Sequence, residues 1–309
     1  MSTKSVRYFR LTLWATIFMF IAEFSGFVDT FTGSISGCGT DYPFCNGKLY
    51  PNFSDYHSVI EYTHRILVFC ASMLLIVVSI LIWRHYKQKK MKLLILFSLS
   101  GIIFESFLGA IAVIYTNPPE LIATHLGTAL LSFAGLLSLT ATLAQMKRGA
   151  QWMEVEPSFK KLSWFTFAYF FVEIYFGAYV ASTGSGGAFQ GFPFPTESLE
   201  NVGRAFWLDV LHRSFAVGLL ILTYLLMSKT KKYKHTRREL YVESRLTFGI
   251  VWLQAFSGAL LVYTHLSLWS ILVHVFLVTL LYGLLSLMGV QSLAKPEAQT
   301  SGGQIRESA

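Results

Sequence analysis

The chain has 309 residues, of which 53% are hydrophobic and 14% are charged, and its formal net charge is +8. A soluble domain usually carries about 25% charged residues, so this composition excludes an ordinary soluble protein and favours an integral membrane protein. The net charge alone would suit a nucleic-acid-binding protein, but the basic residues are divided among alternate loops, and we expect no nucleic-acid partner.

Apolar runs long enough to cross a bilayer recur along the whole chain. Each is close to the ~20 residues that a spanning helix needs, and backbone groups in lipid must be satisfied within the segment, which favours helices. The expected spans lie near residues 11–30, 59–83, 93–115, 119–144, 162–182, 206–228, 246–264 and 268–289. The sequence therefore predicts an all-α integral membrane protein with eight transmembrane helices. The first run is too long for a cleaved signal peptide.

The basic residues are distributed unequally between the two sets of loops. They concentrate at the N-terminus and in the connections 84–92, 147–161 and 229–245. The remaining loops contain only Lys48 and Arg204. Because loops rich in Lys and Arg stay in the cytoplasm, this pattern predicts a multi-pass protein of the cell membrane with both termini cytoplasmic. The loops 31–58 and 183–206 then face outward.

A motif of an acid, two residues, histidine and arginine occurs once in each half of the chain. The two copies are Glu61-Tyr-Thr-His64-Arg65 and Asp209-Val-Leu-His212-Arg213. A second related pair of histidines follows at matching places, His125 after Gly109-Ala110 and His274 after Gly258-Ala259. Each half has four predicted spans, so both halves have the same orientation, as in a parallel repeat. We expect two tandem, similarly oriented four-helix bundles, 1–150 and 151–290, and a disordered cytoplasmic tail, 291–309.

The four repeated histidines are candidate ligands of haem iron. Each lies five or six residues from the predicted outward end of its helix, which corresponds to a depth of roughly 8–10 Å. Two axial imidazoles must reach one iron, so ligands at equal depth are required. We expect His64 to pair with His125 and His212 with His274, one pair per bundle. The alternative is four histidines hydrogen-bonded between helices, which matching depth and repeat spacing make less favourable.

Charged residues beside these histidines are candidates for catalysis and for propionate binding. Glu61 and His64 are three residues apart and share a helix face, so this carboxylate could relay protons or stabilise a developing cation. Alternatively, it orients a neighbour or pairs with Arg65. Arg65 and Arg213 are candidates for contact with haem propionates, and snorkelling to the headgroups is the alternative. Asp209 in place of glutamate suggests that the two sites have different tasks.

The three cysteines divide between a loop and a span. Cys38 and Cys45 lie in the outward loop 31–58, where an oxidising compartment permits a disulfide. Two free thiols are the alternative, because sequence does not fix the geometry. Cys70 is a lone apolar residue of the second span, and we expect it in the core.

Taken together, these residues resemble haem A synthase of the bacterial cytochrome-oxidase assembly family, over about residues 20–290. The most specific matching segments are Gly37-Cys38-Gly39-Thr-Asp-Tyr-Pro43-Phe-Cys45-Asn-Gly47, Ile60-Glu61-Tyr-Thr-His64-Arg65, Leu108-Gly109-Ala110 with His125, Gly177-Ala178-Tyr179-Val180, and Gln254-Ala-Phe-Ser-Gly258 with His274. The resemblance implies oxidation of the C8 methyl group of haem O to a formyl group, which gives haem A for terminal oxidases.

The resemblance also implies a role for each candidate residue. His64 and His125 would hold the substrate haem O, His212 and His274 would hold a haem b cofactor, and Glu61 would be the essential glutamate. Cys38 and Cys45 would form a disulfide found in one branch of the family. Expected partners are haem O and its synthase, membrane lipid and an unidentified electron donor. A homo-oligomer is compatible with the sequence.

Some positions depart from the family pattern. Phe31 stands where a basic residue is expected, Ala181-Ser182 stand where Arg-His is expected, and Glu105 stands where Gln is usual. These changes affect expected partner contacts or substrate fine-tuning rather than the histidines. Two other functions are considered: a di-haem b-type electron-transfer cytochrome and a non-catalytic haem carrier or oxidase assembly factor. A transmembrane cytochrome would place ligands near both membrane faces, whereas all four histidines lie near one.

Overall fold

The structure is a computed structural model of the chain, and it describes residues 3–115, 118–147, 153–188, 191–194, 196–197, 200 and 203–294. The described residues include eight helices that are long and apolar enough to cross a membrane. The predicted fold class, an all-α integral membrane protein with eight spans, is confirmed. Two short 3-10 helices, η1 (Ser185–Ala188) and η2 (Lys231–Tyr233), lie in the connections before and after α7.

Each long helix corresponds to one predicted span, and most extend beyond it, although the spans 93–115 and 246–264 end one residue past α3 and α8. They are α1 (Thr3–Phe31), α2 (Tyr56–His85), α3 (Lys89–Ile114), α4 (Pro119–Lys147), α5 (Pro157–Ser182), α7 (Arg204–Thr230), α8 (Arg238–Tyr263) and α9 (Leu268–Ser292). Apolar runs underestimate helix length because charged residues can continue a helix into the membrane interface. Helix α8 accordingly begins at Arg238 rather than near residue 246, and α1 begins at Thr3 rather than near residue 11.

Local sequence signals mark several helix starts. Asp55 precedes α2, and its side chain accepts a hydrogen bond from the backbone N–H of His57 at 3.1 Å. This satisfies one of the backbone donors left free at a helix N-terminus. Pro157 is the first residue of α5, a position where the missing proline N–H costs no hydrogen bond. Both helices therefore begin where local chemistry favours it.

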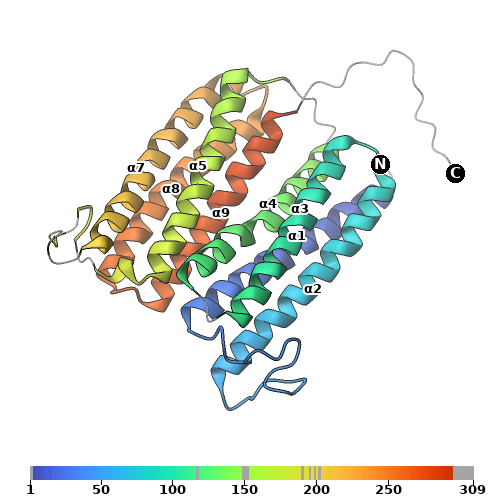
Figure 1. Cartoon of the computed structure of the whole chain (residues 1–309). Coiled ribbons are helices and arrows are strands. Elements are labelled where there is room, and N and C mark those ends of the chain that lie inside the picture. The colour runs from blue at the N-terminus through green and yellow to red at the C-terminus, as the bar shows by residue number, and fades with distance from the viewer. Residues whose placement is uncertain are drawn as a thin grey trace.

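The eight helices form two groups of four that lie side by side (Figure 1). In the first group, α1 packs against α2 and α4, and α3 packs against α2 and α4. In the second group, α5 packs against α7 and α9, and α8 packs against the same two helices. The groups meet where α4 contacts α5 and α9, with a smaller contact between α1 and α9. The predicted boundary at residue 150 lies outside the described residues, as do residues 295–309 of the predicted tail.

Helix α4 has the most buried apolar window of the eight candidate spans. Within the described residues, 78% of that window is buried, against 17–44% for the corresponding windows of the other spans. The reason is its position, because α4 contacts α1 and α3 in its own group and α5 and α9 in the other. The remaining helices each keep an apolar surface exposed, as lipid-facing helices do.

The connections gather at two opposite ends of the molecule. We call the end with the 32–55 loop and the connections after α3, α5 and α8 the loop end, and the end with η2 and the start of α1 the basic end (Figure 1). Cys70 on α2 is exposed, so the expectation that it belongs to the core is wrong. An apolar thiol can face lipid as readily as a protein interior.

Candidate functional site

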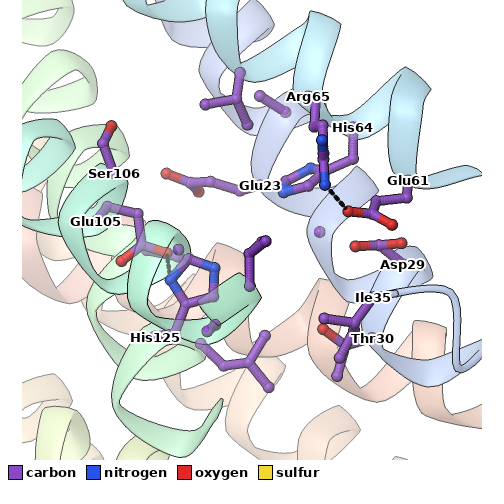
Figure 2. A pocket seen from close by; sticks show the side chains of 18 of the residues that line it. Glu23, Asp29, Thr30, Ile35, Glu61, His64, Arg65, Glu105, Ser106 and His125 are labelled. Atoms are coloured by element: carbon purple, nitrogen blue, oxygen red, sulfur yellow. Dashed lines mark hydrogen bonds and ion pairs between the residues drawn. The ribbon is translucent and has the colours of Figure 1, made fainter. Parts of the chain in front are cut away.

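A cavity of about 380 Å³ lies inside the first helix group. All four helices of the group contribute to its wall, and Ile35, Thr40 and Tyr42 of the 32–55 loop also line it. Most of the lining is apolar, and the polar exceptions include His64 and His125. Figure 2 shows both imidazole rings at this cavity, His64 from α2 and His125 from α4. The structure thus brings together the two histidines that the sequence pairs in the N-terminal half.

His64 is held against helix α1. Its Nδ1 lies 2.9 Å from the hydroxyl of Ser25, and its ring lies over Gly26. A Cβ atom added at Gly26 would lie 3.0 Å from Cε1 of His64, so the absence of a side chain lets the ring approach the helix closely. A histidine whose Nδ1 is hydrogen-bonded has its ring orientation fixed and Nε2 available for a metal.

His125 is held in a similar way against helix α3. Its Nδ1 lies 2.9 Å from Oε1 of Glu105, and the Thr128 hydroxyl donates to the other Glu105 oxygen at 2.9 Å. A Cβ atom added at Gly109 would lie 3.3 Å from Cε1 of His125. A carboxylate behind an imidazole increases its strength as a metal ligand. Glu105, which departs from the family pattern, is therefore in contact with a candidate ligand.

The second helix group repeats these contacts. A Cβ atom at Gly177 of α5 would lie 2.9 Å from Cε1 of His212, and one at Gly258 of α8 would lie 3.8 Å from Cε1 of His274. Nδ1 of His274 lies 2.8 Å from the Ser257 hydroxyl. Each of the four histidines thus faces a glycine on a neighbouring helix, so the repeated spacing in sequence becomes a repeated contact in space.

The second pair also differs from the first in its polar neighbours. Nε2 of His274 lies 2.9 Å from the amide nitrogen of Gln254, the residue at the place of Glu105 in the repeat. Nδ1 of His212 is buried and has no hydrogen-bond partner among the described residues. An unpaired buried nitrogen is unfavourable unless a ligand or water completes it. Both ring nitrogens of His274 therefore have protein partners, whereas Nδ1 of His212 has none among the described residues.

Glu61 connects the cavity to the 32–55 loop. Its side chain is buried, with the residue 3% exposed, and one carboxylate oxygen pairs with Arg65. The other oxygen accepts a hydrogen bond from the backbone N–H of Cys38 at 2.6 Å. Cys38 is joined to Cys45 by a disulfide. The pairing with Arg65 that the sequence offered as an alternative is present, and Glu61 still lines the cavity.

Arg65 and Arg213 anchor equivalent loops. The Arg65 guanidinium donates to the carbonyl oxygens of Phe44 at 3.0 Å and Gly39 at 3.2 Å. Arg213 forms an ion pair with Asp209 at 2.6 Å and donates to the carbonyl of Gly191 at 2.7 Å. Both arginines therefore hold loop backbone at the loop end. Contact of either with haem propionates stays a prediction.

Two acids of α1 that sequence reasoning left without a role also line the cavity. Asp29 is 6% exposed and Glu23 is 8% exposed. Oδ1 of Asp29 and both carboxylate oxygens of Glu23 have no hydrogen-bond partner among the described residues. Figure 2 shows the Asp29 carboxyl group beside that of Glu61. The signal available in the sequence was an acid inside an apolar span, which is uncommon without a function.

The other departures from the family pattern lie at the loop end. Phe31 is the last residue of α1 and is half-buried. The Ser182 hydroxyl, at the end of α5, donates to the carbonyl oxygen of Pro119 at 3.1 Å. Pro119 begins α4, so Ser182 ties the second helix group to the first. The change from the expected histidine at this position therefore accompanies a contact between the groups.

Comparisons with known proteins identify the family of the chain. The sequence model of a family described as "Cytochrome oxidase assembly protein" matches residues 48–286. The heme A synthase of Bacillus pumilus is 29% identical over 285 residues, which cover 89% of this chain and 92% of that protein. The heme A synthase of Staphylococcus aureus strain MSSA476 is 28% identical over 276 residues, which cover 87% and 90%. Since the family match spans well over half of its length, the chain belongs to the cytochrome oxidase assembly protein family.

Proposed function

We propose that the protein is a haem A synthase, an integral membrane oxidoreductase that converts the C8 methyl group of haem O to the formyl group of haem A. The observation that carries this proposal is the cavity in which His64 and His125 meet beside the buried carboxylate of Glu61. The family membership and the similarity to heme A synthases over most of the chain support it.

In this function the substrate haem O binds in the first helix group. His64 and His125 would hold its iron, and Ser25 and Glu105 fix the orientation of the two rings. The apolar lining surrounds the macrocycle and excludes water. Successive hydroxylations of the methyl group followed by dehydration give the formyl group. Glu61, at the cavity wall, takes up a proton or stabilises positive charge as the carbon is oxidised.

The second helix group binds a haem b in this proposal. His212 and His274 would be its ligands, because each ring faces a glycine on a neighbouring helix as the rings of His64 and His125 do. When bound, haem b supplies one-electron transfer. The Ser257 hydroxyl fixes the His274 ring at Nδ1. The amide of Gln254, 2.9 Å from Nε2 of His274, would have to move for that nitrogen to bind the iron.

The proposed location is the cell membrane, with the basic end in the cytoplasm and the loop end outside. The alternation of basic loops supports this orientation. Haem O reaches the cavity from the membrane, supplied by haem O synthase. Each hydroxylation also requires an oxygen source as oxidant and an electron donor, both outside this chain. The Cys38–Cys45 disulfide then lies on the oxidising side.

Co-expression with a source of haem O tests the function. We expect chromatography and mass analysis of the haems extracted from the purified protein to show haem A or a hydroxylated haem O, together with haem b. A protein lacking all four histidines, matched in membrane level, is the control and should yield none of these. Recovery of haem b alone from the unaltered protein would contradict the enzyme and favour an electron-transfer cytochrome or haem carrier.

A further inference from the structure

We propose that Asp29 is a second catalytic carboxyl group, which acts with Glu61 as an acid–base pair in the dehydration that forms the formyl group. This inference rests on the proposed function and goes beyond it by assigning a residue and a step. Asp29 lines the same cavity as Glu61 and His64. It is 6% exposed, and its Oδ1 has no hydrogen-bond partner among the described residues.

Helix geometry places the two carboxyl groups at the same level. Asp29 lies three residues after Gly26, the residue that faces the His64 ring, so both are on one face of α1. Glu61 lies three residues before His64 on α2, which packs against α1. The two helices run in opposite directions. Along the helix axes, the Cα atoms of Asp29 and Glu61 therefore lie about 4.5 Å closer to the loop end than those of Gly26 and His64, at 1.5 Å per residue. In Figure 2 the two labelled carboxyl groups lie beside one another.

The partners of the two groups assign the acid and the base. Glu61 has the Arg65 guanidinium and the Cys38 N–H as donors, and charge-assisted hydrogen bonds of this kind stabilise an ionised carboxylate. Oδ1 of Asp29 has no hydrogen-bond partner among the described residues, and an ionised Asp29, which is 6% exposed, would lie beside the negative charge of Glu61. Two neighbouring carboxyl groups in such a place share a single proton. That proton belongs on Asp29, so Glu61 is the base and Asp29 the acid.

The dehydration step needs both roles at once. After two hydroxylations the former methyl carbon carries two hydroxyl groups. Glu61 removes the proton from one hydroxyl as its C=O bond forms, the other C–O bond breaks, and the departing hydroxyl takes the Asp29 proton and leaves as water. No electrons are transferred, and the carboxyl pair still holds one proton, now on Glu61. Transfer of that proton back to Asp29 restores the starting state.

Exchange of the formyl oxygen with water isolates this step from the oxidations. Hydration of the formyl group and its reversal use the same acid and base, so a protein loaded with haem A should speed the exchange. The purified protein is loaded with haem A and placed in water labelled with a heavy oxygen isotope, and mass spectrometry follows the label in the extracted haem. We expect faster exchange than for haem A in detergent alone.

Asp29→Asn should reduce the protein-catalysed exchange about 10²-fold, the scale of general acid catalysis, while haem absorbance is retained. The matched control is Glu173→Gln, which changes a buried carboxyl group of α5 in the other helix group and should leave exchange unchanged. Asp29→Glu retains an acid and should keep most of the exchange. This variant also provides a test if the Asn variant cannot be loaded with haem A.

The outcomes separate this inference from the proposed function. Equal exchange in the Asp29→Asn variant and the unaltered protein would overturn the role of Asp29, even if the unaltered protein makes haem A. Exchange at the protein-free rate in a fully loaded Asp29→Glu variant would do the same. Failure of the unaltered protein to make haem A from haem O, despite a measurable Asp29-dependent exchange, would count against the proposed function alone.

Discussion

Glu61 binds two donors, and a single substitution separates its charge from its hydrogen bonding. Glu61→Gln keeps the size of the side chain and an oxygen for the Cys38 N–H, but it cannot take up a proton at the same oxygen. We expect both haem sites to stay filled while haem A formation falls about 10²–10⁴-fold, the usual contribution of a catalytic acid or base, with a hydroxylated haem O accumulating.

The same substitution discriminates between the two roles of Glu61. If Glu61 only holds Arg65 and the loop, the Gln variant should lose haem from the cavity rather than stop the reaction. The measurement is haem content by absorbance beside product analysis of the extracted haems. Normal haem A output at matched protein level would remove the catalytic role.

The second pair of histidines carries a separate prediction. His212→Ala or His274→Ala should abolish the low-spin haem b absorbance of the C-terminal site, because each removes one of the two proposed iron ligands. His265→Ala is a suitable control, since His265 is exposed in the connection between α8 and α9. An undiminished low-spin spectrum in either ligand variant would show that the assignment is mistaken.

At the scale of single residues, the sequence singled out the four histidines and Glu61 but not the side chains around them. Repeat spacing and the acid-x-x-His-Arg motif are local signals, so His64 and Glu61 could be found without a structure. Asp29 could not be related to Glu61, because their proximity depends on how α1 packs against α2. Cys70 was misplaced because hydropathy does not distinguish a lipid-facing from a core position within a span.

The close approach between helices at the histidines predicts a graded response to added methyl groups. Gly26→Ala and Gly177→Ala would place a Cβ at 3.0 Å and 2.9 Å from a histidine ring, whereas Gly258→Ala would place it at 3.8 Å, an ordinary contact. We expect the first two to lower haem content per protein severalfold and Gly258→Ala to change it little. Alanine has a higher helix propensity than glycine. Any loss of haem in these variants would therefore result from the contact between the new Cβ and the histidine ring, not from a weaker helix.

Gly249→Ala provides the control, because a Cβ at Gly249 on α8 meets nothing within 4 Å. This substitution should leave haem content unchanged. It should leave thermal stability unchanged or raise it slightly, because alanine has a higher helix propensity than glycine. The readouts are haem absorbance and the thermal unfolding midpoint in detergent. Equal effects at Gly26 and Gly258 would contradict the geometric explanation.

The 32–55 loop carries the next prediction. We expect Cys38 and Cys45 to be bonded to each other in the isolated protein, as they are in the structure. Alkylation without reduction should therefore modify Cys70 alone, which is exposed on α2, and mass analysis after reduction should find two further sites. Modification of all three thiols before reduction would refute the bond. The disulfide should contribute only modestly to stability, because it closes a short loop.

Helix existence was predictable from hydropathy, whereas helix length and neighbours were not. Every predicted span corresponds to a long helix, because an apolar run in a membrane protein has few other structures to adopt. Several helices extend beyond the predicted spans to charged residues such as Arg238, because hydropathy assigns charged residues to loops. The contact of Ser182 with Pro119 could not be foreseen, since it depends on how the two helix groups meet.

For the molecule as a whole, the orientation in the membrane can be measured directly. In a Cys70→Ser background, Tyr115→Cys adds an exposed thiol at the loop end, and Thr236→Cys adds one at the basic end. A membrane-impermeant maleimide applied to intact cells should label the first and spare the second, because basic loops remain in the cytoplasm. Both should react once the membrane is permeabilised. Labelling of Thr236→Cys alone in intact cells would show that the basic end, not the loop end, faces outward.

The burial of α4 has a consequence for how the protein is made. Its buried hydroxyl groups contact the helices that precede it: Thr140 lies 2.8 Å from the Thr16 hydroxyl of α1, and Ser132 donates to the carbonyl oxygen of Ser98 on α3 at 2.9 Å. Leu130 and Ala134 instead belong to the apolar core shared with α5 and α9. A ribosome completes α4 before α5 and α9 exist. During membrane insertion the hydroxyl groups of α4 therefore find partners on helices that are already made, and only its apolar side waits beside lipid for the later ones.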